Sequence, residues 1–259
     1  MKENTSQFTD FTSDVDLFSS KRGIHAIDSP VKKKILSMLN NQELSFEEIV
    51  SYSGKAKSTV SVHLRGLSDA GIIGAKTNPA DARKKIFFTT SLFLGGALKD
   101  ERQRFDTDEY IPEYIPGNRD STDYYRFIMS TIRVTLLNEG ITIDPLFERS
   151  GVRVGKAIYH ALACPDFPGL INNMKKFWED HNMGHIEMVD HDPLTLMIYD
   201  CFECVNLPVL GRPACAFEAG VISAVFSAYY GESRKAVETG CYAAGDSFCR
   251  FVITKPSAH

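Results

Sequence analysis

The chain has 259 residues, of which 43% are hydrophobic and 24% charged, and its formal net charge is −4. This composition is typical of globular proteins with one or two domains, and it excludes collagen-like and low-complexity classes. No apolar run reaches the roughly 18 residues that span a bilayer. The first residues are polar and acidic and lack the apolar stretch of a secretory signal, so we expect a cytoplasmic protein.

Charge is distributed unevenly along the chain. Between Ser20 and Lys99 there are thirteen Lys and Arg against six Asp and Glu, whereas residues 100–259 hold fifteen basic and twenty-three acidic residues. A basic segment joined to an acidic one indicates that only the first meets a polyanion such as DNA. A solvated basic face is the alternative interpretation.

The first twenty residues show no periodic pattern, and we expect them to be flexible. A helix is predicted from Asp28-Ser29-Pro30, where an N-cap residue is followed by proline, to Asn40-Asn41. Val31, Ile35 and Leu36 recur at helical spacing along it. This is the first of three short helices.

The second helix is predicted to begin after Ser45, with Glu48 completing a capping box, and to break at Gly54. The third is predicted over residues 57–70 and stops at Gly71, as a glycine beyond a helix C-terminus would make it do. Residues 72–73, a polar loop over 77–83 and a β-rich return over 85–90 then form a hairpin. Three helices closed by a hairpin predict a winged helix-turn-helix.

The third helix and the hairpin carry the side chains that this fold needs for DNA. Short hydroxyls near a helix N-terminus approach phosphates and base edges, arginine reaches guanine in the major groove, and cations on a wing contact the backbone. The expected DNA-binding residues are Lys57, Ser58, Thr59, Ser61, His63, Arg65, Arg83, Lys84 and Lys85. The alternative is a protein-interaction module in which His63 is only a hydrogen-bonded structural residue.

The segment KSTVSVHLRGLSDAGII resembles the recognition helix of ArsR-type and related archaeal winged-helix regulators. The residues that match their pattern are Ser58, Ser61, His63, Leu64, Leu67, Ala70 and Gly71. The resemblance covers about 70 residues and implies binding to double-stranded promoter DNA. Because paired half-sites normally require two-fold symmetry, we also expect a homodimer.

Beyond a charged linker, the C-terminal half alternates helices and strands. Helices are predicted over 124–137, 152–162, 170–181 and 217–230, the last of them buried, and strands over 186–189, 194–198 and 248–253. The fold class is therefore α+β. The predicted organisation is a flexible segment 1–20, a winged helix-turn-helix 21–98, a linker 99–122 and a sensor domain 123–259.

All six cysteines lie in the last 100 residues, which indicates metal or thiol chemistry in one domain rather than a disulfide framework. Glu238 and Cys241 are three residues apart, so on a helix they would share one face. With Cys215 and Cys249 they would supply three thiolates and a carboxylate, a closed tetrahedral set that zinc favours in structural sites. Buried free cysteines beside a surface glutamate are the alternative.

Cys201 and Cys204 form a Cys-x-x-Cys motif with three open roles. Such a pair can close a disulfide and often has lowered thiol pKa values, it can contribute to a metal site, or it can line the core. Cys164 is a weaker candidate for a thiol that resolves an oxidised partner.

The run from Gly211 to Ile253 resembles the 4-vinyl-reductase-type domain, a small-molecule-binding α/β fold, over roughly residues 122–255. That family includes the sensor domains of aromatic-responsive bacterial activators, and the resemblance implies structural zinc at Cys215, Glu238, Cys241 and Cys249. A winged helix joined to this domain is similar to the methanogen redox regulators called MsvR. In that family the sensor cysteines are implicated in redox control of promoter binding.

The sequence therefore predicts a redox-responsive transcription regulator. The alternative is a regulator gated by a small hydrophobic or aromatic ligand in the sensor domain. We do not expect an enzyme, because no dinucleotide fingerprint, Walker-type loop or nucleophile–base pair is evident.

Overall fold

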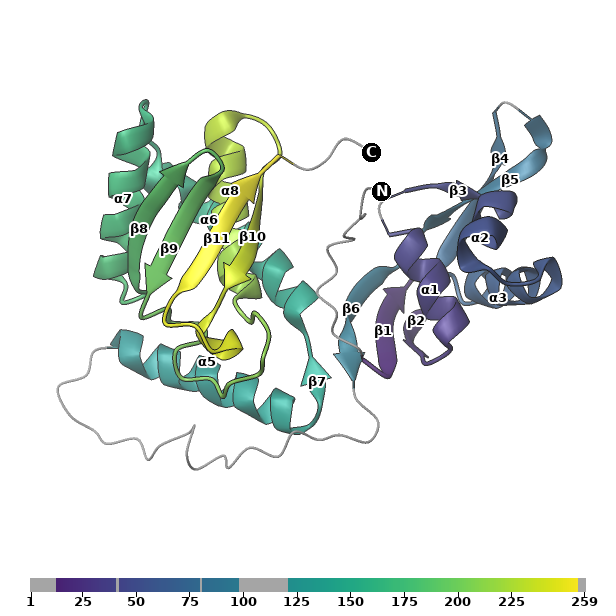
Figure 1. Cartoon of the computed structure of the whole chain (residues 1–259), viewed down its shortest axis with the longest axis horizontal. Coiled ribbons are helices and arrows are strands. Elements are labelled where there is room, and N and C mark those ends of the chain that lie inside the picture. The colour runs from purple at the N-terminus through teal and green to yellow at the C-terminus, as the bar shows by residue number, and fades with distance from the viewer. Residues whose placement is uncertain (1–12, 41, 80, 98–120, 256–259) are drawn as a thin grey trace. The chain divides into compact units, whose positions relative to one another are not determined.

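The computed structural model describes residues 13–40, 42–79, 81–97 and 121–255. The chain divides into two compact units, one up to Glu101 and one from Arg102 (Figure 1). Each combines helices and strands, which confirms the α+β class. Most of the predicted linker lies outside the described residues, so its flexibility stays a prediction. None of the described helices has the length and apolarity needed to cross a membrane.

Three helices form the centre of the N-terminal unit, as predicted: α1 (Pro30–Met38), α2 (Phe46–Ser53) and α3 (Lys57–Asp69). Their ends follow local signals. The side chain of Ser29 accepts a hydrogen bond from the N–H of Lys32, and Ser45 and Glu48 form both hydrogen bonds of a capping box. Gly54 ends α2 in the left-handed conformation, at φ 66°.

The predicted hairpin is present but its turn is shorter than expected. β4 (Ile73–Asn78) and β5 (Asp81–Thr89) pair antiparallel as far as Asn78 and Asp81, and β3 (Leu44–Ser45) adds to the other side of β5. The predicted loop over 77–83 is therefore wrong in length, because its polar residues alternate along two paired strands. Arg83 and Lys84 consequently lie within β5.

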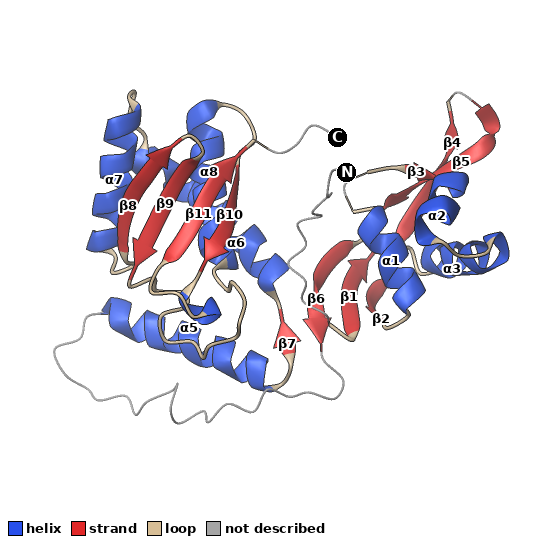
Figure 2. Ribbon diagram, viewed as in Figure 1, coloured by secondary structure: helices blue, strands red, loops and turns tan. Residues whose placement is uncertain are grey.

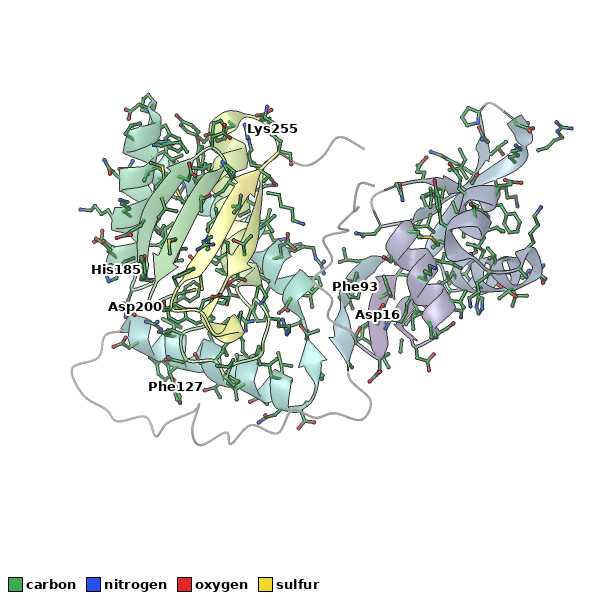
Figure 3. The ribbon with its side chains drawn as sticks, viewed as in Figure 1. Asp16, Phe93, Phe127, His185, Asp200 and Lys255 are labelled. Carbon is green, nitrogen blue, oxygen red and sulfur yellow. The ribbon has the colours of Figure 1, made fainter. Side chains whose placement is uncertain are left out.

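A second small sheet corrects the prediction of a flexible N-terminus. β1 (Val15–Ser20) pairs antiparallel with β2 (Gly23–Ile27) and with β6 (Leu92–Ala97), so residues 15–20 are structured. Phe18 is buried and its ring lies 5.2 Å, centroid to centroid, from that of Phe93, which Figure 3 labels. Residues 1–12 lie outside the described residues.

The C-terminal unit is a four-stranded antiparallel sheet in the order β10-β11-β9-β8, with α6, α7 and α8 on one face and α5 across one end (Figure 2). Its strands are β7 (Ile141–Thr142), β8 (His185–His191), β9 (Leu194–Tyr199), β10 (Lys235–Gly240) and β11 (Cys249–Thr254). Its helices are α5 (Ser121–Asn138), α6 (Asp144–Leu162), α7 (Phe167–Asp180), α8 (Ala216–Tyr230) and the short 3₁₀ helix Tyr242–Ala244.

The core of this unit is α8, whose residues 218–226 are all buried, as predicted for an apolar segment rich in small residues. Glycines let it approach α6 closely. A Cβ atom on Gly151 would lie 1.9 Å from the carbonyl oxygen of Phe217, and one on Gly220 would lie 2.1 Å from that of Glu148. This packing fixes the N-terminus of α8, where Cys215 is the N-cap residue.

Candidate functional site

The polar side of α3 is accessible, as a recognition helix requires. Val60, Leu64 and Leu67 are buried on its inner side. At helical spacing, four predicted DNA contacts share the opposite, exposed side: Lys57, Ser58, Ser61 and Arg65. The other two, Thr59 and His63, are half-buried at its margins.

The wing offers three exposed cations, Arg83, Lys84 and Lys85, all in β5. Arg83 Nε lies 3.3 Å from Asp81 Oδ1, an exposed pair that DNA phosphates can replace. Val62 was missed by the sequence reasoning, although helical spacing places it on the exposed side of α3, where it is 67% exposed. An exposed methyl-bearing side chain there is suited to contact with a thymine methyl group.

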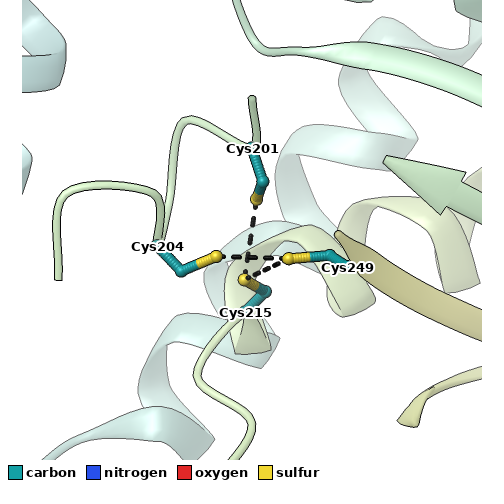
Figure 4. Close-up of side chains that lie close together, drawn as sticks. All are labelled: Cys201, Cys204, Cys215 and Cys249. Carbon is teal, nitrogen blue, oxygen red and sulfur yellow. Dashed lines mark hydrogen bonds between the residues drawn. The ribbon is translucent and has the colours of Figure 1, made fainter. Parts of the chain in front are cut away.

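Five of the six cysteines meet in the buried interior of the C-terminal unit. They come from the turn after β9, the N-cap of α8, the residue after β10 and the first residue of β11: Cys201, Cys204, Cys215, Cys241 and Cys249. Four of them are drawn in Figure 4, where the sulfur atoms point toward one another. Cys164 lies outside this cluster, half-buried, with its Sγ 3.6 Å from Asp166 Oδ2.

The predicted zinc ligands lie together within this cluster. Sγ of Cys215 is 3.8 Å from that of Cys241 and 3.6 Å from that of Cys249, and the last two are 4.0 Å apart. Two sulfurs bound tetrahedrally at about 2.3 Å to zinc are about 3.8 Å apart. All three sulfurs and a Glu238 carboxylate oxygen lie within 4.8 Å of one another. The spacing therefore fits a tetrahedral metal ion.

The carboxylate of Glu238 has the polarity of a ligand. Its Oε2 accepts a hydrogen bond from the backbone N–H of Cys215 at 2.8 Å, while its Oε1 is buried and has no hydrogen-bond partner among the described residues. Burial raises the pKa of the Glu238 carboxyl and of the Cys215 thiol well above their ordinary values, so their charged forms need a nearby cation.

The predicted reason for this arrangement was wrong. Glu238 and Cys241 do not share a helix face, because Glu238 lies in β10 and Cys241 follows the end of that strand. An irregularity in the pairing between Glu238 and Gly240 accompanies this strand end.

Cys201 and Cys204 extend the cluster. Sγ of Cys201 lies 3.6 Å from that of Cys215, and Sγ of Cys204 lies 3.2 Å from that of Cys249. These four sulfurs also lie within 4.8 Å of one another, so they form a second group able to hold a metal ion. Burial alone is consistent with core packing, but the mutual approach of the sulfurs indicates chemistry.

Glu203, between the two cysteines, connects their turn to two helices. Its carboxylate accepts hydrogen bonds from the N–H groups of Phe217 and Glu218 at the start of α8, at 3.1 and 2.9 Å. Arg133 of α5 donates to the same carboxylate at 2.6 Å and to the carbonyl oxygen of Ala214 at 2.5 Å. Burial raises the pKa of Glu203 to about 7, and the Arg133 charge opposes this rise.

Glu218 is the other buried acid that sequence reasoning missed, although it is the only charged residue in α8. Trp178 Nε1 donates a hydrogen bond to its Oε1, and Cys201 Sγ lies 3.7 Å from its Oε2. Burial, followed by the proximity of Cys201, raises the pKa of Glu218 well above its ordinary value.

Comparison with known sequence families matches both units. Residues 29–74 match the family described as bacterial regulatory protein, arsR family, and residues 194–255 match the vinyl-4-reductase domain family. Among curated relatives, the uncharacterized protein MJ1642 of Methanocaldococcus jannaschii is 34% identical over 99 residues, which are 38% of this chain and 59% of that protein. The uncharacterized protein MJ0150 of the same organism is 27% identical over 128 residues, 49% of this chain and 73% of that protein.

Two solved structures are similar at low identity. A vinyl-4-reductase family protein from M. jannaschii has a TM-score of 0.39 at 14% identity and covers 54% of this chain and 85% of its own. The phenol-responsive sensory domain of the transcription activator PoxR, solved with phenol, has a TM-score of 0.38 at 17% identity, covering 59% and 84%. From the two family matches, the chain is an ArsR-type DNA-binding regulator in which an N-terminal helix-turn-helix domain is fused to a C-terminal vinyl-4-reductase domain.

Proposed function

We propose that this regulator binds promoter DNA through α3 and the β4–β5 wing, and that the redox state of its buried thiols controls this binding. The exposed side of α3 would enter the major groove, with Lys57, Ser58, Ser61 and Arg65 as its principal contacts. Arg83, Lys84 and Lys85 would contact the backbone. Thr59 and His63 would contribute at the margin of the same surface.

The observation that carries the redox proposal is the convergence of five thiols with two carboxylates in a closed interior. Zinc is the metal we assign to Cys215, Glu238, Cys241 and Cys249, because three thiolates and one carboxylate suit its tetrahedral preference. Zinc bound there neutralises buried charge and holds β10, β11 and α8 together.

Oxidation and zinc binding compete for the same sulfur atoms. The shortest sulfur separation within the thiol cluster is that between Cys204 and Cys249, at 3.2 Å. Hydrogen peroxide would take two electrons from these two thiols, forming one disulfide and two water molecules. Cys249 would then be lost as a zinc ligand. Cys201 and Cys164 are the remaining thiols through which this disulfide can rearrange.

The turn that carries the oxidised cysteine also contacts α5. Glu203 precedes Cys204 and forms a buried ion pair with Arg133 of α5, the first described helix after the residues that join the two units. A disulfide that displaces this turn would change the position of α5. Control then requires that the reduced and oxidised states differ in affinity for DNA.

The test is binding of the purified chain to its own upstream DNA in a gel shift, with dithiothreitol or with hydrogen peroxide. We expect affinity to depend on the redox state in the native chain and in Cys164→Ala, and to lose that dependence in Cys204→Ala. Equal binding in both states, with zinc retained, would refute thiol control and would favour a sensor gated by a hydrophobic or aromatic ligand.

Two further parts of the proposal are tested separately. A homodimer is expected because a two-fold pair of wings would match paired half-sites, and light scattering of the free chain measures its mass. Promoter binding would place the protein in the cytoplasm, where thiols are kept reduced until an oxidant appears.

A further inference from the structure

The two candidate metal groups in the thiol cluster overlap, and the overlap has a simple consequence. One group is Cys201, Cys204, Cys215 and Cys249, and the other is Cys215, Glu238, Cys241 and Cys249. They share Cys215 and Cys249. Two four-coordinate ions that share two ligands need six ligands in total, and five cysteines with Glu238 supply six.

We propose that the C-terminal domain binds a pair of zinc ions bridged by the thiolates of Cys215 and Cys249. One ion would be completed by Cys241 and Glu238 and the other by Cys201 and Cys204. This deepens the proposed function, because it assigns the reduced state of the Cys-x-x-Cys motif as a metal ligand and adds a second ion to the zinc site already described.

The separation of the bridging sulfurs suits this role. Sγ of Cys215 and Sγ of Cys249 are 3.6 Å apart. Two sulfurs at that separation, each about 2.3 Å from zinc, subtend an angle of roughly 100° at the ion, close to tetrahedral. The same two sulfurs can contact an ion on either side, and the two ions would then lie about 3 Å apart.

The terminal ligands lie on opposite sides of the bridging pair in the pattern of distances. Cys241 is within 4.0 Å of both bridging sulfurs. Cys201 is 3.6 Å from Cys215, while Cys204 is 3.2 Å from Cys249. Only the last separation is well short of the roughly 3.8 Å expected at zinc, so binding would move Cys204 outward by about half an ångström.

Charge favours two ions over one. Five thiolates and one carboxylate carry six negative charges in a site from which water is excluded, and burying unpaired charge is costly. Two divalent ions leave two negative charges, the same as one zinc bound by four thiolates. A single ion would leave two sulfurs of the cluster without a metal.

Metal content of the full chain tests the proposal directly. Purified under reducing conditions, the native chain and the control Cys164→Ser should each hold two zinc ions per chain by native mass spectrometry and elemental analysis. The double variant Cys201→Ser/Cys204→Ser should hold half as much. One zinc per native chain, or two in the double variant, would overturn the bridged pair.

Cobalt gives a test that needs no variant. As Co²⁺ is added to the metal-free native chain, the paramagnetic resonance signal should rise through one equivalent and fall through the second, because bridging thiolates couple the two spins. A signal that rises in proportion through two equivalents would mean separate sites and would refute the bridge. Both experiments omit DNA, so their outcome is independent of whether thiol oxidation controls promoter binding.

Discussion

Replacing Arg133 with methionine should destabilise the C-terminal unit far more than loss of an exposed ion pair would. The side chains of Arg133 and Glu203 are only 5% and 3% exposed, and Nη1 lies 2.6 Å from Oε1. Methionine fills much of the same volume but leaves the Glu203 carboxylate buried without its cation. Removing one partner of a buried pair costs about 3–5 kcal/mol. At about 4 °C per kcal/mol for a domain of this size, the melting temperature should fall by about 10–20 °C.

The chain is well suited to this measurement, because it contains one tryptophan. Trp178 is fully buried in the C-terminal unit, so its fluorescence during urea unfolding reports that unit alone. Lys255→Met is the matched control: Lys255 and Glu232 lie 3.0 Å apart but are 64% and 44% exposed. This control should cost less than about 1 kcal/mol.

A double variant separates the ion pair from other effects of Arg133. Glutamine at position 203 keeps an oxygen that can accept the hydrogen bonds from the start of α8, but carries no charge. Arg133→Met/Glu203→Gln should therefore be more stable than Arg133→Met by about 2 kcal/mol. The reasoning fails if Arg133→Met costs no more than Lys255→Met, or if the double variant is no more stable than Arg133→Met alone.

Three other substitutions test the fold and a fourth change tests the DNA contacts. Gly220→Ala should destabilise the C-terminal unit by at least about 1–3 kcal/mol in the same assay, because its Cβ would meet a backbone oxygen at 2.1 Å. Gly66→Ala, with its nearest neighbour at 3.6 Å, should instead stabilise α3 by up to about 1 kcal/mol, measured by circular dichroism. Ser45→Ala should cost about 1 kcal/mol through loss of the capping box, and an unchanged midpoint would contradict that. Removing Arg83 and Lys85 together should reduce the slope of log affinity against log salt by about 2, and an unaltered slope would exclude the wing from phosphate contact.

The features that the sequence predicts well are those decided by neighbouring residues. The N-caps at Ser29 and Ser45 and the glycine at the end of α2 each act within one helical turn, so their signals are complete in a few residues. β1 was missed for the opposite reason. Its residues become a strand only by pairing with β6, more than seventy positions later, and its last residues, Ser19 and Ser20, give no apolar signal.

The thiol cluster shows the same division. The types and order of Cys215, Glu238, Cys241 and Cys249 are sufficient to suggest a metal site, although the helix expected to bring two of them together is a strand end. The convergence of Cys201 and Cys204 on that site depends on a turn after β9 whose position follows from the whole sheet. Arg133 was beyond prediction, since it contacts Glu203 from seventy residues away and no local pattern marks it.

Glu203 is the residue through which the thiol centre and α5 are connected, and a mild substitution tests that connection. Glu203→Gln retains the acceptor for the N–H groups of Phe217 and Glu218, and it removes the charge that attracts Arg133. If the Cys204 turn acts on α5 through this ion pair, the variant should bind zinc like the native chain and bind DNA when reduced. Its DNA affinity should, however, change less on peroxide treatment than that of the native chain. An undiminished response with normal zinc content would show that the thiol state reaches the DNA-binding domain by another route, such as the zinc-dependent packing of α8 against α6.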